Sequence, residues 1–300
     1  MSIAQHLPAP LHRLAVQTVY GALNVLRPMP LPATGATLSL NACFHTERLD
    51  DDAVFATLLA WCRDFRAITG VGAWLCVMTP EGSMIRDRLA RSGFEAERYG
   101  ERVRALADVA EIGYHGHYVT ADGQPAAGGR FTIEAAQDQI RAEISWLREL
   151  DLAPQIYTGG WWVVSPELLT ALAAEGIRLD CSTRGQQSGT FGDRYPGAIP
   201  GVGERFELVP PVVEIASLPY FAMPWARYRR LVASGIPDLG DRPQWAVLPL
   251  HDYSLVGIPR DDLDIVRQLS RLPYVRWVTA SEAIYPNAPE WRADAVVTPG

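Results

Sequence analysis

Two histidines separated by one glycine are the sharpest chemical feature of the sequence. His115 and His117 follow the run Glu111–Tyr114, which has the composition of a β-strand. In an extended chain, residues i and i+2 point to the same face, so the two imidazoles can converge on one point. Zn²⁺ binds imidazole nitrogens at about 2.0–2.1 Å, and Gly116 allows the backbone to adjust to that approach. The pair indicates a metal site, with ordinary polar residues as the alternative for so short a motif.

A second histidine ends a strongly apolar run, Ala246–Leu250, and is followed by Asp252. Imidazole exchanges protons near neutral pH, so His251 is predicted to act in proton transfer. Asp252 is expected either to fix that imidazole or to hold a neighbouring backbone group. Capping of the following turn is its structural alternative.

Two adjacent tryptophans, Trp161 and Trp162, follow a pair of glycines after another apolar run. Tryptophan side chains at a strand end can form a flat apolar wall for a sugar ring or an acyl group. Packing in the core is the alternative for at least one of them.

The rest of the chain must bring these segments to one end of the molecule. Short β-rich runs alternate with helical patterns, which predicts parallel strands covered by helices in a closed or partly open barrel. In such folds the carboxyl ends of the strands build the active site. The expected strands are 37–42, 72–78, 110–115, 154–158, 178–181, 211–217, 245–250 and 275–278, and the expected helices are 51–69, 82–92, 95–107, a long one after Thr132, 166–175 and 261–272.

The domain organisation follows from the same pattern. Residues 1–35 are expected to form a helical and proline-rich extension, and residues 36–300 a single barrel domain. Two long loops, Tyr118–Arg130 and Thr183–Pro210, are typical of binding loops or lids.

Composition excludes several classes of protein. Over 300 residues, 27 basic and 34 acidic side chains give a net charge of −7, which argues against a nucleic-acid partner. No apolar run is long enough to predict a transmembrane segment. The four cysteines form no CxxC pair, which favours free thiols and a cytoplasmic location.

The motifs and their order resemble the polysaccharide deacetylases of the NodB-homology type, carbohydrate esterase family 4, over residues 37–286. Glu111–His115 is similar to the second motif of that family, whose first histidine binds the metal. Tyr157–Trp161 is similar to the third motif, and Leu248–Asp252 to the last, in which the histidine is the general acid. The resemblance implies an α/β fold, a single distorted (β/α) barrel of about seven to eight mostly parallel strands, which hydrolyses N-acetyl groups of amino sugars with a divalent metal.

The sequence also departs from that family. The second metal histidine usually lies four residues after the first, but Val119 stands there, so His117 must take its place. The Asp-Asp pair of the first motif corresponds in this comparison to Asn41 and Ala42, which cannot act as base and ligand. An arginine usual in the third motif is Thr158.

Two functions remain open on these grounds. In the first, a divalent metal, zinc before others, is held by His115 and His117 with His45 or Glu47 as third ligand, and the enzyme removes an N-acyl group from an amino sugar or a polysaccharide precursor. His251 is then the general acid, with Glu47 or Asp252 as base. The residues expected against the substrate are Trp161, Trp162, Tyr114 and Asn41. In the second, an inactive barrel binds carbohydrate or supports a glycan-biosynthesis complex.

Overall fold

The computed structural model describes residues 37–118, 133–183, 205–217, 244–256 and 261–286. The expected extension over residues 1–35 and most of the two expected long loops lie outside the described residues. The strands are β1 (Leu38–Thr46), β2 (Trp74–Val77), β3 (Glu111–Gly116), β4 (Ile156–Gly159), β5 (Leu179–Asp180), β6 (Arg205–Val209), β7 (Val212–Ile215), β8 (Gln244–His251) and β9 (Val275–Trp277). The helices are α2 (Asp52–Thr69), α3 (Ser83–Ser92), α4 (Ala96–Ala107), α5 (Ile133–Glu149), α6 (Pro166–Ala174), α8 (Asp261–Ser270) and α9 (Ala280–Ile284), with short 3₁₀ turns η2 (Gly160–Trp162) and η3 (Asp252–Leu255).

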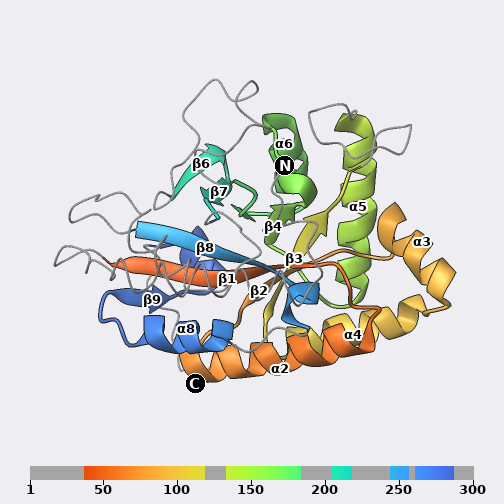
Figure 1. Cartoon of the computed structure of the whole chain (residues 1–300). Coiled ribbons are helices and arrows are strands. Elements are labelled where there is room, and N and C mark those ends of the chain that lie inside the picture. The colour runs from red at the N-terminus through yellow and green to blue at the C-terminus, as the bar shows by residue number, and fades with distance from the viewer. Residues whose placement is uncertain (1–36, 119–132, 184–204, 218–243, 257–260, 287–300) are drawn as a thin grey trace, which may run out of the picture.

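One curved sheet forms the centre of the molecule, in the order β6-β7-β5-β4-β3-β2-β1-β8, and β9 pairs with β1. All described pairings are parallel except that of β6 with β7. A parallel bridge between Ser217, just after β7, and Val247 of β8 links the two ends of this order. The helices lie outside the sheet, with α2, α4 and α8 along one side and α5 and α6 along another (Figure 1). The predicted distorted barrel of mostly parallel strands is confirmed.

Two of the expected boundaries are wrong. The first strand does not stop at Ala42 but continues to Thr46, and all nine of its residues are buried. The stretch expected as one long loop up to Pro210 contains β6. In this longer strand His45 is one of the last two residues, and Glu47 follows directly after the strand end. These two positions decide the geometry of the site.

Apolar side chains divide between the two faces of the sheet. The larger cluster joins residues such as Phe44 and Leu75 to the helices around the barrel. The smaller one fills the barrel and contains Cys43, Cys76 and Cys181. Because successive strand residues face opposite sides, side chains of the same parity as these cysteines continue upward along the inside of the barrel.

Helix α2 shows how the segment after β1 is fixed. Its N-cap Asp51 accepts hydrogen bonds from the backbone N–H groups of Ala53 and Val54, and the helix ends at Gly70, whose φ of +82° is the left-handed conformation that glycine adopts without strain. The turn that carries Glu47 therefore runs from the end of β1 at Thr46 to the N-cap of α2 at Asp51, and both of these ends are fixed.

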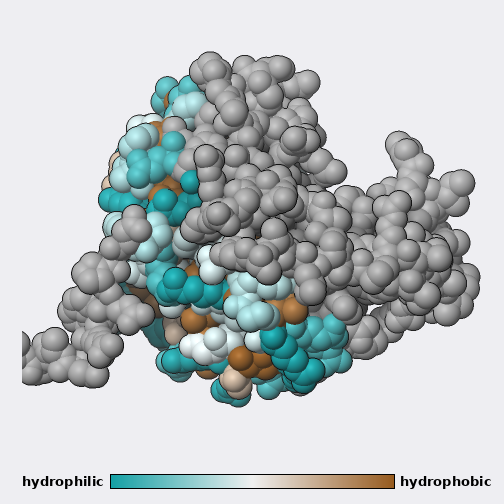
Figure 2. Space-filling model, turned by 90° about the vertical axis from the view of Figure 1, so that its left-hand side faces the viewer, coloured by the Kyte–Doolittle hydropathy of each residue, from teal (hydrophilic) through white to brown (hydrophobic). Residues whose placement is uncertain are grey.

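The described part of the face shown in Figure 2 is mainly polar. In Figure 2 the brown hydrophobic residues form small separate patches among teal ones. Among the described residues, no helix is both long and apolar enough to cross a membrane. The four cysteines are buried free thiols.

Candidate metal centre

Four histidines and Glu47 meet at the carboxyl end of the barrel strands. His45 of β1 is in register with His251 of β8, and His115 of β3 is in register with Thr158 of β4. His45, His115 and His251 have the parity of the residues that fill the barrel, so their rings lie at its mouth. His117 follows β3 by one residue, and Glu47 follows β1. The described residues thus confirm that these segments converge, as the parallel arrangement predicts.

Glu47, His115 and His117 present three ligand atoms to one another at the distances of a metal site. The Oε1 atom of Glu47 lies 3.5 Å from His115 Nε2 and 3.4 Å from His117 Nε2, and the two Nε2 atoms are 2.9 Å apart. A tetrahedral zinc ion about 2.0–2.2 Å from each ligand separates its ligand atoms by about 3.3–3.6 Å. Both oxygen-to-nitrogen distances match this spacing, and the two nitrogens need to separate by only a few tenths of an ångström for the three groups to hold a divalent metal ion as a two-histidine, one-carboxylate set.

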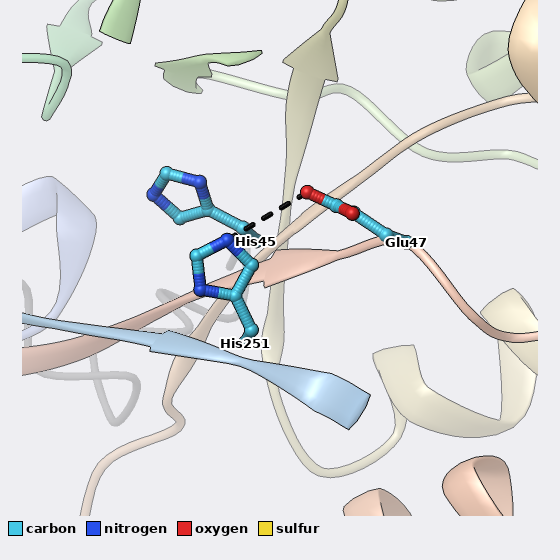
Figure 3. A group of neighbouring side chains, drawn as sticks. All are labelled: His45, Glu47 and His251. Carbon is cyan, nitrogen blue, oxygen red and sulfur yellow. Dashed lines mark ion pairs between the residues drawn. The ribbon is translucent and has the colours of Figure 1, made fainter. Parts of the chain in front are cut away.

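His45 and His251 lie close to the same carboxylate. Figure 3 shows both imidazoles beside the carboxylate of Glu47, with His251 Nε2 3.7 Å from Glu47 Oε1. The ring centroid of His45 is 4.7 Å from that of His251 and 4.7 Å from that of His115. His45, Glu47 and His251 also offer ligand atoms within 4.8 Å of one another. Three imidazoles thus approach Oε1 of Glu47, and the ring of His45 lies against two of them, those of His115 and His251.

The charges of the cluster favour metal binding. Burial alone raises the pKa of Glu47, but hydrogen bonds and charge from His115 and His117 outweigh burial and hold this pKa well below its usual value. Burial lowers the pKa of His117, and burial together with His115 and His251 lowers the pKa of His45 well below its usual value. An ionised carboxylate beside neutral imidazoles is the form of these ligands that binds a metal.

The peptide group of Glu47 is fixed from both sides. Its N–H and that of Arg48 donate to Oδ2 of Asp252, at 3.0 and 2.7 Å. Its carbonyl oxygen accepts a hydrogen bond from Arg88, which also pairs with Asp50. Both oxygens of the fully buried Asp252 are engaged, because Oδ1 accepts the N–H of Tyr253. Of the two expected roles of Asp252, the structure shows the backbone-holding one.

Thr158 orients two of the histidines. Its carbonyl oxygen lies 2.7 Å from His115 Nδ1, so Nδ1 carries the proton and Nε2 is left for a metal. Its hydroxyl oxygen lies 3.1 Å from His45 Nε2. The sequence indicated only that Thr158 stands where an arginine is usual. The contacts show that this threonine orients the rings of His115 and His45.

The two tryptophans hold the rings rather than forming an open wall. The ring of Trp161 packs edge-on against that of His117, with 4.4 Å between the ring centroids. The ring of Trp162 packs against that of His45, with 4.9 Å between the centroids. Both residues have positive φ, 52° and 60°, which is a strained backbone for side chains larger than glycine. A Cβ on the preceding Gly160 would lie 2.4 Å from the His117 ring, so only glycine fits there. Both tryptophans are half-buried, which leaves part of each available to a substrate.

Two of the residues expected against the substrate lie elsewhere. Asn41 is fully buried in the middle of β1, four residues before His45, and its Nδ2 donates to the carbonyl oxygens of Gly72 and Val278. It had been placed at the site because the first strand was expected to end there. Tyr114 is fully buried on the opposite face of β3 from His115, against Tyr157. Strand alternation turns it toward the helices, so neither residue belongs to the site.

Comparison with solved structures agrees with this fold. No family model and no curated protein matches the sequence. A protein described as a putative polysaccharide deacetylase from Mycobacterium smegmatis superposes with a TM-score of 0.56 at 14% identity, covering 85% of this chain and 93% of its own. A 4-alpha-glucanotransferase from Thermococcus litoralis gives 0.54 at 14% identity, with 85% of this chain and 41% of that one covered. A family 4 carbohydrate esterase from Streptomyces lividans, in complex with acetate, gives 0.42 at 11% identity over 83% of this chain and 94% of that one. At these identities the likeness concerns the fold alone, and a TM-score of 0.42 carries no argument. The chain thus has the fold of a NodB-like polysaccharide deacetylase, as its motifs suggested.

Proposed function

We propose that the protein is a metal-dependent hydrolase that removes an N-acyl group, acetyl first among them, from an amino sugar or a polysaccharide precursor. The observation that carries this proposal is the triangle of Glu47 Oε1, His115 Nε2 and His117 Nε2, in which both oxygen-to-nitrogen distances match a tetrahedral zinc site. The deacetylase fold and the half-buried tryptophans beside the triangle support the class of substrate. The buried free thiols support a reducing, cytoplasmic compartment.

Each residue of the cluster then has one task. Glu47, His115 and His117 hold the ion, and His45 is not needed as a third ligand. A divalent ion held by these residues would supply Lewis acidity toward the acyl carbonyl and would lower the pKa of a bound water. His45 is assigned as the base that takes the proton of the attacking water, because Asp252 is engaged with the backbone and Glu47 is a ligand. His251 protonates the nitrogen as the C–N bond breaks, so that an amine and a carboxylate leave.

Acetate release tests this assignment. The wild-type protein, loaded with Zn²⁺, is expected to release acetate from N-acetylated amino sugars and to stop when a chelator removes the metal. His251→Ala should lower kcat by about 10²–10⁴-fold, the usual contribution of acid–base catalysis, while its zinc content stays that of the wild type.

Zinc content is the control that separates a proton donor from a ligand. Loss of zinc together with activity in His251→Ala would contradict the acid role. Full activity after exhaustive chelation would contradict a metal-dependent reaction. Zinc binding without hydrolysis of any N-acylated sugar would favour a carbohydrate-binding barrel.

A further inference from the structure

His117 stands beyond the last paired residue of its strand and therefore needs another support. The register of β3 with β4 ends at Gly116 opposite Gly159. Gly160 and Trp161 confine the ring of His117 from one side. Its main chain is held from helix α5, where Nε2 of Gln139 donates to the carbonyl oxygen of His117 at 2.9 Å.

The amide group of Gln139 has a single possible orientation. The same Nε2 atom also donates to Oε1 of Glu143, one turn further along α5, at 2.6 Å. An amide nitrogen carries two hydrogens and no acceptor, so both are used by these two acceptors. A flipped amide would direct its oxygen at a carbonyl and a carboxylate, which is unfavourable. The Gln139 side chain is therefore a fixed link rather than a mobile surface group.

Glu143, which accepts the second hydrogen bond of Gln139, is a buried carboxylate. It interrupts the apolar stripe of α5 formed by Ala136, Ile140, Ile144 and Leu147, and only 1% of it is exposed. Its second oxygen accepts the hydroxyl of Thr79 at 3.0 Å, and a Cβ on Gly82 would lie 2.9 Å from its Oε1. A buried carboxylate is costly unless it is hydrogen-bonded, so this placement points to a task other than packing.

We propose that Gln139 is a positioning residue for the metal ligand His117, and that Glu143 and Thr79 fix Gln139. This inference rests on the proposed metal site. It explains how His117, only two residues after His115, can be a metal ligand although it lies beyond the end of the strand. Gln139 holds the backbone of His117 at its carbonyl oxygen, and Gly160 and Trp161 hold its ring, so Nε2 stays directed at the metal. Replacing a residue that supports a metal ligand in this way typically lowers metal affinity or activity by about 10–100-fold.

Zinc affinity of Gln139→Met tests the proposal. Methionine has nearly the length of glutamine but no donor. Competition with a chromogenic chelator is expected to show a loss of about 10–100-fold in affinity for Zn²⁺ relative to wild type. Gln137→Met is the matched control, since Gln137 lies two residues away on the same helix and is exposed. Gln139→Met also leaves Oε1 of the buried Glu143 without this donor, so the unfolding temperature of the metal-free protein should fall further in this variant than in Gln137→Met, and zinc affinities are compared at a temperature at which both variants are folded. Equal zinc affinity of the two variants would overturn the proposal.

Two further measurements separate positioning from folding and from function. Thr79→Val removes the hydroxyl that fixes Glu143 and should also weaken zinc binding; if Gln139→Met fails to fold, unchanged zinc affinity of Thr79→Val overturns the proposal. Any hydrolysis of N-acetyl sugars lost in Gln139→Met should return at saturating Zn²⁺. Weakened zinc binding in a protein that hydrolyses no N-acetyl sugar supports the positioning role and refutes the proposed reaction. Absence of zinc binding by the wild type overturns both.

Discussion

Glu47 reaches three imidazoles because its peptide group is clamped between Asp252 and Arg88. Its Oε1 lies within 3.7 Å of Nε2 of His115, His117 and His251, whereas His45 Nε2 faces the hydroxyl of Thr158. The sequence left His45 and Glu47 as equal candidates for the third ligand. Residue types and spacing cannot separate two side chains that flank one strand end, because the choice depends on contacts with β4 and β8.

Replacing Asp252 tests whether this residue positions Glu47 or transfers protons. Asp252→Ala leaves three partly buried N–H groups, those of Glu47, Arg48 and Tyr253, without their acceptor. We expect a loss of about 1–3 kcal/mol in the free energy of unfolding, measured with urea, together with weaker zinc binding.

An exposed aspartate supplies the comparison for this variant. Asp264→Ala in α8 removes only a surface ion pair with Arg267 and should change neither quantity noticeably. A catalytic base at Asp252 would instead give an Asp252→Ala protein with wild-type stability and zinc affinity but a strongly reduced kcat, and this outcome would refute the positioning role.

At the scale of elements, the sequence did not predict where the first strand ends. Strand β1 is buried at all nine positions, its polar residues Ser39, Asn41 and His45 included, so a polar residue does not mark its end, as is common in parallel sheets. The end of the strand was therefore predicted too early, at Ala42. The histidines were predicted near the ends of their strands, and the structure has His115 within β3, His117 directly after β3 and His251 as the last residue of β8. Glu143 on the apolar stripe of α5 was a visible signal of a buried polar network, but its target, the carbonyl of His117, depends on how α5 packs on β3.

The turn after β4 offers a test at this scale. In Gly160→Ala the added Cβ would lie 2.4 Å from the ring of His117, so the ring must leave the position in which it faces Glu47 and His115. We expect zinc affinity, measured by competition with a chelator, to fall at least as far as the 10–100-fold or so typical of a lost outer contact.

A second glycine serves as the control for that substitution. A Cβ on Gly100 in α4 would meet Leu150 Cδ2 at 3.3 Å, far along the chain from the metal ligands. Gly100→Ala should leave zinc affinity unchanged. Wild-type zinc affinity in Gly160→Ala would show that the turn does not confine His117.

Closure of the barrel brings residues from opposite ends of the sequence to one site at the scale of the whole molecule. His45 and His251 are more than 200 positions apart in the chain, yet they are register partners across β1 and β8. Alternation of strands and helices was enough to predict this architecture, because parallel strands place their carboxyl ends together. The antiparallel strand β6 was not predicted; among the described residues it pairs with β7 alone, at the end of the strand order, and it follows a stretch with six glycines between positions 185 and 203.

Zinc binding by three matched variants tests the central claim most directly, that Glu47 rather than His45 completes the metal site with His115 and His117. Isothermal titration of the metal-free protein should give about one tightly bound Zn²⁺ per wild-type chain, in keeping with a single tetrahedral site. Glu47→Ala and His115→Ala should abolish that binding, and His45→Ala should retain it. Retention of tight zinc binding by Glu47→Ala with its loss in His45→Ala would contradict the account.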